Sequence, residues 1–206
     1  MGDNRVFVSR EAVEGLSVYT VGDRNIYLAG DISPESTSEA ATKLIAAITN
    51  ISSQAMILRD AEIGHINMYI QSGGGTIHDM WGLIDFMLTS PIPIYTYSVG
   101  LTASAALKIF LAGSVRYVMP HSMLMYHELA AGTSGKLEGI SEWKDYLEKE
   151  QQKIEEYVKS RTFMKAKQIR EIREKKKDFY MGADEAIELG FATHKFECPN
   201  WGNIAL

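Results

Sequence analysis

Short apolar runs rich in β-branched and aromatic residues recur along the chain, and each is expected to form a strand. The runs are RNIYLAGDIS from residue 24, with the strand ending at Gly30, HINMYIQS from 65, IPIYTYSVG from 92, SVRYVMP from 114 and SMLMYHE from 122. Between the first runs lie segments whose apolar residues recur every three or four positions, as on one face of a helix. Strands that alternate with helices in this way predict parallel βαβ units, and therefore an α/β fold whose helices cover a mostly buried sheet.

Three helices are expected in the first half of the chain. The segment SPESTSEAATKLIAAI begins with Ser33 as N-cap, and its apolar face is formed by Leu44, Ile45 and Ile48. A third helix begins near Ser104. The second helix, between these two, is expected in the segment TIHDMWGLIDFMLTS, which has an apolar stripe made of Ile77, Met80, Trp81, Ile84 and Met87.

The second half changes character, because a charged segment from Ile140 to about Lys177 follows the alternating units. It is expected to be helical, with an apolar stripe made of Ile140, Trp143, Leu147, Ile154, Tyr157 and Val158. Such a stripe packs either on its own domain or on a neighbouring subunit, and the pattern alone leaves both open. The segment DEAIELGFATH then predicts a short helix that ends at Gly190.

Composition narrows the class of protein. The 206 residues are 46% hydrophobic and 23% charged, which is typical of a globular protein, and one domain over 1–206 is expected. A formal charge of −5 argues against binding to nucleic acid or to an acidic membrane, since both need a cationic surface. The single cysteine, Cys198, excludes an internal disulfide and a thiolate zinc site. The N-terminal MGDNRVFVSREAVEG lacks the apolar core of a signal peptide or membrane anchor, so a cytoplasmic location is expected.

Candidate chemistry is expected in the loops after Ile70, Val99 and Tyr126, because ligands of open α/β sheets collect beyond the carboxyl ends of the strands. These loops carry SGGG, GLTAS and HE. The glycines do not form a nucleotide motif, since the sixth position of G-x-G-x-x-G is His78 and the P-loop Lys-Ser/Thr pair is missing. They indicate either a tight turn or a backbone that approaches a ligand closely and offers N–H donors.

Ser104 either caps the following helix through its hydroxyl or is a nucleophile on a tight strand-to-helix turn. A nucleophilic serine needs a base, and two histidines remain as candidates. His127 would face Ser104 from the end of its own strand, whereas a histidine at the position of His78 is more often an ordinary first-turn helix residue. For an orienting acid, Asp178 stands out only because the strand-like FYM follows it. The other histidines lie away from the carboxyl ends of the strands: His65, His121 and His194.

Four ordered segments carry a resemblance to a known family: INMYIQSGGGTI, YSVGLTASAALKIFLAG, VMPHSMLMYHE and DFYMGADEAIELGFAT. Over about residues 24–194 the chain resembles ClpP, the proteolytic subunit of the Clp family of ATP-dependent serine peptidases. The resemblance implies a crotonase-like α/β fold of repeated ββα/βαβ units, with a protruding handle helix in about residues 132–177. The first 23 residues match poorly, and in the family that region lines the axial entrance to a chamber.

The resemblance also implies catalytic roles. Ser104 matches the nucleophile of the family's G-x-x-A-S turn, and His127 matches the base that follows a strand containing Pro-x-Ser. Asp178 matches the acid that stands seven residues before the E-A pair beginning at Glu185. Together they would form a Ser-His-Asp triad for acyl transfer.

Further residues follow from the same resemblance. Gly75 and Ala105 match the two residues whose backbone N–H groups form the oxyanion hole. An extended substrate would lie beside Gly74, Ile77 and Leu129.

Three departures from the family pattern surround these positions. Gly73 stands where the family usually has proline, which predicts a more mobile oxyanion turn. Leu129 replaces the proline usually found two residues after the histidine, so the substrate strand would be held differently. The segment between Ser104 and His127 is about two residues shorter than usual.

The expected function is therefore that of a serine endopeptidase that hydrolyses unfolded polypeptides or short peptides inside an oligomeric chamber. The resemblance implies partners: further copies of the chain in stacked rings, as a double heptamer, and an AAA+ unfoldase such as ClpX or ClpA. No metal or cofactor is expected, and ATP would be used only by the unfoldase. One alternative is a ring subunit that has lost catalysis, which the three filled triad positions disfavour. The other is a crotonase-type acyl-CoA enzyme, for which an aligned serine, histidine and aspartate would be surplus.

Overall fold

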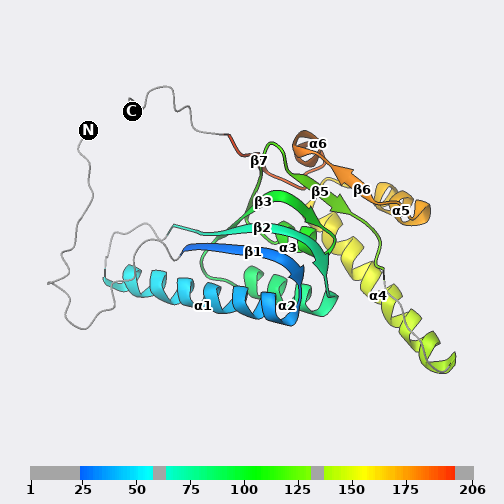
Figure 1. Cartoon of the computed structure of the whole chain (residues 1–206), viewed down its shortest axis with the longest axis horizontal. Coiled ribbons are helices and arrows are strands. Elements are labelled where there is room, and N and C mark those ends of the chain that lie inside the picture. Colours follow the sequence, from blue (N-terminus) through cyan, green and yellow to red (C-terminus); the bar gives the residue numbers. More distant parts are fainter. Residues whose placement is uncertain (1–23, 58–63, 131–136, 198–206) are drawn as a thin grey trace.

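The computed structural model describes residues 24–57, 64–130 and 137–197, so the poorly matching first 23 residues and Cys198 lie outside the described part. Strands and helices alternate as far as residue 111, and two consecutive strands then precede a long helix, as the sequence predicts (Figure 1). The strands are β1 (Asn25–Ile32), β2 (Ile66–Gly75), β3 (Ile94–Ala103), β4 (Val115–Val118), β5 (Met123–Tyr126), β6 (Phe179–Met181) and β7 (His194–Lys195). The helices are α1 (Pro34–Ile57), α2 (Ile77–Leu88), α3 (Ala105–Leu111), α4 (Leu137–Arg161), α5 (Ala166–Lys175) and α6 (Ala183–Glu188).

The described strands form one seven-stranded sheet in the order β1-β2-β3-β4-β7, with β5 paired to both β3 and β6. The pairs along this order and the β3–β5 pair are parallel, and β5–β6 is antiparallel. β3 pairs twice, through residues 95–98 with β4 and through residues 101–103 with β5. The α/β fold with parallel βαβ units is thus confirmed, and the carboxyl ends of β3 and β5 lie side by side.

The start of α1 is the one predicted from the sequence. The N–H of Ser36 donates to Ser33 Oγ at 3.3 Å, and the N–H of Ser33 donates to Ser36 Oγ at 3.0 Å. Each hydroxyl thereby satisfies an N–H group near the helix start. The predicted apolar face is wrong at Ile45, which is 52% exposed, because adjacent residues of a helix are turned by about 100° from each other. The residues that face the core are Ala40, Leu44, Ala47 and Ile51.

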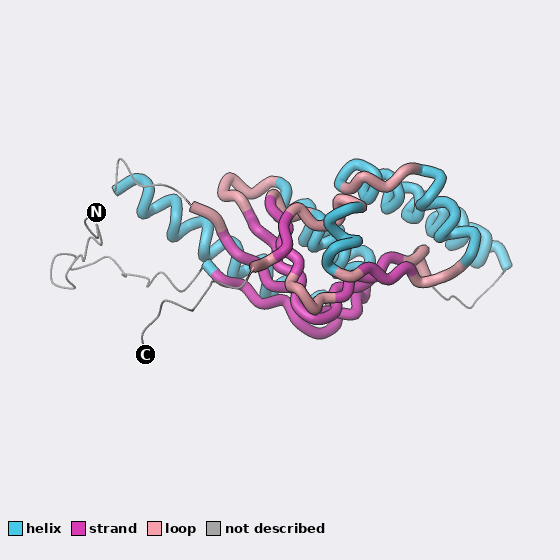
Figure 2. The backbone as a smooth tube through the Cα atoms, turned by 90° about the horizontal axis from the view of Figure 1, so that it is seen from above, coloured by secondary structure: helices cyan, strands magenta, loops and turns pink. Residues whose placement is uncertain are grey.

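The helices lie on one side of the strands in Figure 2, so the helices of the described residues cover one face of the sheet. Met80, Ile84 and Met87 of the predicted α2 stripe are buried against that face, together with Trp81. The other face carries a row of tyrosines in register across neighbouring strands. The ring of Tyr97 stacks between those of Tyr69 and Tyr117 at centroid distances of 4.7 and 4.9 Å. This stacking leaves the central ring 8% exposed without a helix above it.

Two predicted strand ends differ from the structure. β1 continues past Gly30 to Ile32, because Gly30 adopts a φ of 79° at a register irregularity and the pairing with β2 then resumes. β2 likewise continues through the glycines, since Gly74 pairs with Asp31 and Gly75 pairs with Ile32. The interpretation of these glycines as a tight turn is therefore wrong, and they extend the carboxyl end of β2 along its pairing with β1.

The predicted handle region forms two helices. α4 runs away from the sheet (Figure 1), and residues 162–165 separate it from α5. Ile154 and Val158 near its carboxyl end are buried in the core, whereas Ile140 near the other end is 38% exposed. The apolar stripe therefore packs on the chain's own core along one half of α4 and leaves the other half projecting. Residues 131–136, which begin the handle region, lie outside the described residues.

Candidate active site

Ser104 lies at the junction of β3 and α3 in a strained conformation. Its φ is 53° and its ψ is −122°, a region that residues with a side chain rarely adopt. Among the described residues its hydroxyl makes no capping bond to α3, so the capping interpretation is wrong for the side chain, although Ser104 does occupy the N-cap position. The Ser104 Oγ lies instead 2.7 Å from His127 Nε2. The strained turn thus directs the hydroxyl at the imidazole.

The short parallel pairing between β3 and β5 positions the Ser104 hydroxyl and the His127 imidazole. Ala103 is the register partner of Met125, and the N–H of Ser104 donates to the Met125 carbonyl at 3.0 Å. His127 follows the last residue of β5 and therefore reaches the side of Ser104. His78 does not, because its Nε2 lies 3.2 Å from the Tyr146 hydroxyl on α4. Of the two histidines that the sequence left open, the structure brings His127 to the serine.

Partial burial lowers the pKa of His127 below its usual 6.5, and the positive charge of Lys108 lowers it further. The carboxylates of Asp178 and Glu128 oppose these effects. Because the lowering effects dominate, the imidazole is neutral at neutral pH and can accept a proton from the Ser104 hydroxyl.

Asp178 comes to the same region from a different part of the chain. β6 runs antiparallel to β5 with Phe179 opposite Tyr126, so Asp178 and His127 are the next residues beyond that pair. The Asp178 side chain is exposed, and within the described residues it makes no hydrogen bond or ion pair. It acts on His127 through its charge. The structure therefore brings Asp178 near His127 but not into hydrogen-bond contact with it.

The glycines of β2 pack against the serine turn. A Cβ added to Gly74, whose φ is 108°, would lie 2.6 Å from Ser104 Cβ and 3.1 Å from the Ala105 nitrogen. A Cβ added to Gly75 would lie 2.1 Å from the carbonyl oxygen of Ile32. The second interpretation of these glycines, a close approach of the backbone, is thus the one that fits. The N–H of Ala105 belongs to the first turn of α3, where such groups have no partner within the helix.

A cleft of about 60 Å³ gathers most of the residues that the sequence singled out. A larger cavity of about 400 Å³ lies between α5, β6 and α6, and it includes Asp178 but neither Ser104 nor His127. We consider the smaller cleft the candidate site, because it holds the serine–histidine pair. Its lining includes Gly75, Ile77, Ser104, Ala105, His127 and Leu129.

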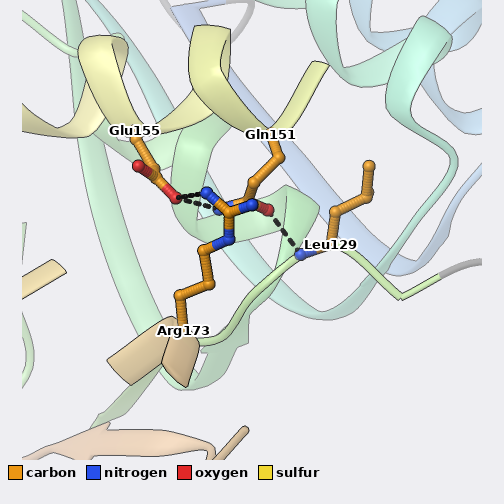
Figure 3. Close-up of polar contacts among 4 residues, drawn as sticks. All are labelled: Leu129, Gln151, Glu155 and Arg173. Carbon is orange, nitrogen blue, oxygen red and sulfur yellow. Dashed lines mark hydrogen bonds and ion pairs between the residues drawn. The ribbon is translucent and has the colours of Figure 1, made fainter. Parts of the chain in front are cut away.

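One feature near the cleft was missed from the sequence. The N–H of Leu129 donates to Gln151 Oε1 at 2.7 Å, and Gln151 Nε2 donates to Glu155 Oε1 at 2.7 Å (Figure 3). Arg173 of α5 lies 3.6 Å from the same carboxylate oxygen. Gln151 is 6% exposed and precedes Ile154 by three positions on the buried side of α4. A polar residue at helical spacing from an apolar stripe was the signal that could have revealed it.

Lys108 was also missed. It belongs to α3, all of whose residues, AALKIFL, are buried, and it is itself 4% exposed. Its Nζ lies 4.9 Å from the centroid of the Tyr126 ring, and burial lowers the pKa of Lys108 to about 7. A lone lysine inside an apolar run was the available signal.

Among the described residues, no group of three or more histidine, cysteine, aspartate or glutamate side chains is arranged to hold a metal ion. The helices in the same residues are all too short or too polar to cross a membrane.

Comparison of the sequence with known proteins shows the family to which this chain belongs. The family model described as Clp protease matches residues 18–197. The chain is 30% identical to the ATP-dependent Clp protease proteolytic subunit 1 of Prochlorococcus marinus (strain NATL2A), over 78% of this chain and 79% of that protein. It is 29% identical to the subunit 1 of Corynebacterium jeikeium (strain K411), over 84% of this chain and 86% of that protein. It is 30% identical to the subunit 2 of Treponema denticola, over 82% of this chain and 80% of that protein. The chain therefore belongs to the Clp protease family, and so to the Clp-type serine peptidases.

Proposed function

We propose that the chain is a serine endopeptidase whose catalytic triad is Ser104, His127 and Asp178. The observation that carries the proposal is the 2.7 Å separation of Ser104 Oγ and His127 Nε2, at a turn where Ser104 is held at a φ of 53°. A strained serine beside a neutral imidazole is the arrangement that nucleophilic acyl transfer needs.

In the proposed reaction, His127 Nε2 takes the proton of Ser104 as Oγ attacks the peptide carbonyl carbon. The N–H groups of Gly75 and Ala105 donate to the oxyanion of the tetrahedral intermediate. The imidazolium then protonates the leaving amine, and the C–N bond breaks to give an acyl-serine. Water, deprotonated by His127, then attacks the carbonyl carbon of the acyl-serine. The bond from that carbon to Oγ breaks, the imidazolium returns its proton to Oγ, and the acid product leaves. No metal or cofactor takes part.

The role assigned to Asp178 is to stabilise the imidazolium of His127, which forms during each half of the reaction. Its charge raises the pKa of His127 and so stabilises the protonated ring. Its position beyond the Tyr126–Phe179 pair, opposite His127, supports this role. The role requires the carboxylate to reach His127 Nδ1 during the reaction.

The substrate is proposed to be an extended polypeptide that lies beside Gly74, Ile77 and Leu129, pairing through its backbone as an added strand. The names of the relatives support an ATP-dependent protease in which this chain is the proteolytic subunit. We infer that copies of the chain form stacked rings, as a double heptamer, around an enclosed chamber. The projecting half of α4 would make the contact between rings, and an AAA+ unfoldase such as ClpX or ClpA would supply substrate. A single domain over 1–206 and a cytoplasmic location stay predictions.

Labelling with a fluorophosphonate tests the catalytic proposal, because only an activated serine reacts with it. The wild-type chain should be labelled on Ser104, and the Ser104→Ala and His127→Ala variants should lose labelling and peptide hydrolysis together. Asp178→Asn should be nearly as severe, because the imidazole would be misoriented. An unlabelled wild-type serine would favour a ring subunit without activity or an acyl-CoA enzyme. Normal hydrolysis by pure Ser104→Ala protein would overturn the mechanism.

A second experiment tests the chamber. The isolated protein is incubated with a folded reporter and with the same reporter after unfolding. An enclosed site should cleave the unfolded form and spare the folded form, since a typical domain stability of ~5–15 kcal/mol makes spontaneous opening rare. Equal cleavage of both forms, or a monomer in light scattering at micromolar concentration, would refute the ring assembly.

A further inference from the structure

Lys108 lies in the first turn of α3, four residues after Ser104. Side chains of a helix lean toward its N-terminus, which in α3 is the end that follows Ser104. It lines the same cleft as Ser104 and His127. The mechanism proposed above makes no use of it.

This lysine has no counter-ion in the described structure. The side chain is 4% exposed, and within the described residues its Nζ makes neither an ion pair nor a hydrogen bond. Its contact is the face of the Tyr126 ring, at 4.9 Å from Nζ to the centroid. Burying an ammonium group without an anionic partner is costly, and an aromatic face offsets only part of that cost.

Among the described residues, the elements around Lys108 supply no anion that pairs with it. Burial raises the pKa values of Tyr126 on β5 and Tyr157 on α4, so both phenols stay neutral. Glu128 lines the cleft, and Glu155 on α4 bonds to Gln151 instead. His127 feels the lysine as a positive charge that lowers its own pKa. The described residues therefore leave the ammonium group of Lys108, which lines the cleft, without an anionic partner.

We propose that Lys108 is a specificity-determining residue, which binds the side-chain carboxylate of an acidic substrate residue and so favours cleavage after glutamate or aspartate. The inference rests on the serine peptidase function proposed above. The acidic residue is the one whose carbonyl Ser104 attacks, because Lys108 and Ser104 line one small cleft. A bound carboxylate supplies the missing counter-ion and keeps the ammonium charged, as in other charge-assisted hydrogen bonds.

The test compares two fluorogenic peptide amides that differ only in the residue before the cleaved bond, glutamate or glutamine. Neither has a C-terminal carboxylate, so the glutamate side chain is the carboxylate that differs between them. Wild-type kcat/KM should favour glutamate by about tenfold near pH 6. The preference should fall as the pH rises through the pKa of Lys108, about 7. Titration of His127 affects both peptides alike and cancels in their ratio.

The Lys108→Met variant should lose the preference and cleave the glutamine peptide at least as well as the glutamate peptide. Lys153→Met is the matched control, since the Nζ of Lys153 also lies over an aromatic ring, 4.3 Å from the centroid of Trp81, but outside the cleft. It should keep the wild-type ratio.

A wild-type ratio of one or less near pH 6, or an unchanged ratio in Lys108→Met, would overturn the proposal. If Lys108→Met does not fold, the pH dependence of the wild-type ratio decides the question by itself. Failure of the peptidase proposal looks different, because both peptides would then be uncleaved and Ser104 unlabelled by the fluorophosphonate.

Discussion

The replacement of Gly74 by alanine tests the contact between β2 and the serine turn. An alanine Cβ at this position would lie 2.6 Å from Ser104 Cβ, 3.1 Å from the Ala103 carbonyl oxygen and 3.1 Å from the Ala105 nitrogen. Two of these atoms are backbone, so the neighbours have little freedom to move aside. The φ of 108° is an additional obstacle for any residue that has a side chain.

The two effects can be given rough magnitudes. A strained backbone angle costs ~1–3 kcal/mol, and an overpacked site costs a further ~1–3 kcal/mol. Gly74→Ala should therefore lower the free energy of unfolding by about 2–6 kcal/mol. If the chain stays folded, Ser104 or the N–H of Ala105 must shift, and catalysis should fall by about 100-fold, the loss typical of a weakened oxyanion site.

Gly73→Ala provides a matched control one residue away, because a Cβ added to Gly73 meets nothing within 4 Å. Urea denaturation measures the stability of both variants, and the rate of fluorophosphonate labelling measures the reactivity of Ser104 in the folded fraction. Gly73→Ala should behave like the wild-type chain in both assays. Equal stability and equal labelling rates for the two alanine variants would show that β2 does not press on the serine turn.

Three further predictions concern the same site. Because burial and Lys108 lower the pKa of His127, the acid limb of kcat/KM should have its midpoint below 6.5, and a midpoint above that value in a pH profile would contradict the described environment. Gln151→Leu should raise KM for peptides and lower stability by about 1–3 kcal/mol, since the Leu129 N–H loses its acceptor. Gln152→Leu, at the exposed neighbouring position, is the control. Equal KM values for the two variants would count against a role of Gln151 in holding Leu129. Ser104→Gly should be about 1 kcal/mol more stable than Ser104→Ala in urea denaturation, because glycine adopts the φ of 53° without strain; a more stable alanine variant would refute strain at this turn.

Much of the fold follows from local periodicity. The strands of the βαβ units and the α2 stripe are visible because buried positions recur every two or every three to four residues. Local patterns could not show where β1 and β2 end, because Gly30 and Gly74 continue a strand only when a neighbouring strand supplies the pairing. They could not separate Leu44 from Ile45 either, since both are apolar and only the packing against the sheet decides which one is buried.

The candidate site shows the same division between local and long-range information. Ser104 and His127 lie 23 positions apart in the sequence, and nothing in either segment alone specifies that Oγ and Nε2 meet at 2.7 Å. The parallel pairing of Ala103 with Met125 creates that contact, so it depends on the sheet as a whole. The strained φ of Ser104 was likewise not predictable, because serine at a strand-to-helix junction ordinarily caps the helix.

Lys108 and Asp178 illustrate how misleading the type of a residue can be when its surroundings are unknown. A lysine is ordinarily an exposed cation, yet Lys108 is buried with a pKa of about 7, because the seven residues of α3 are enclosed on every side. A triad aspartate is ordinarily enclosed, yet Asp178 is exposed at the end of a charged helix. Burial of the imidazole is the largest effect that lowers the pKa of His127, and the positive charge of Lys108 lowers it further, against the negative charges of Asp178 and Glu128. The pKa of the proposed base therefore depends in part on a lysine that the sequence alone places in an ordinary apolar helix.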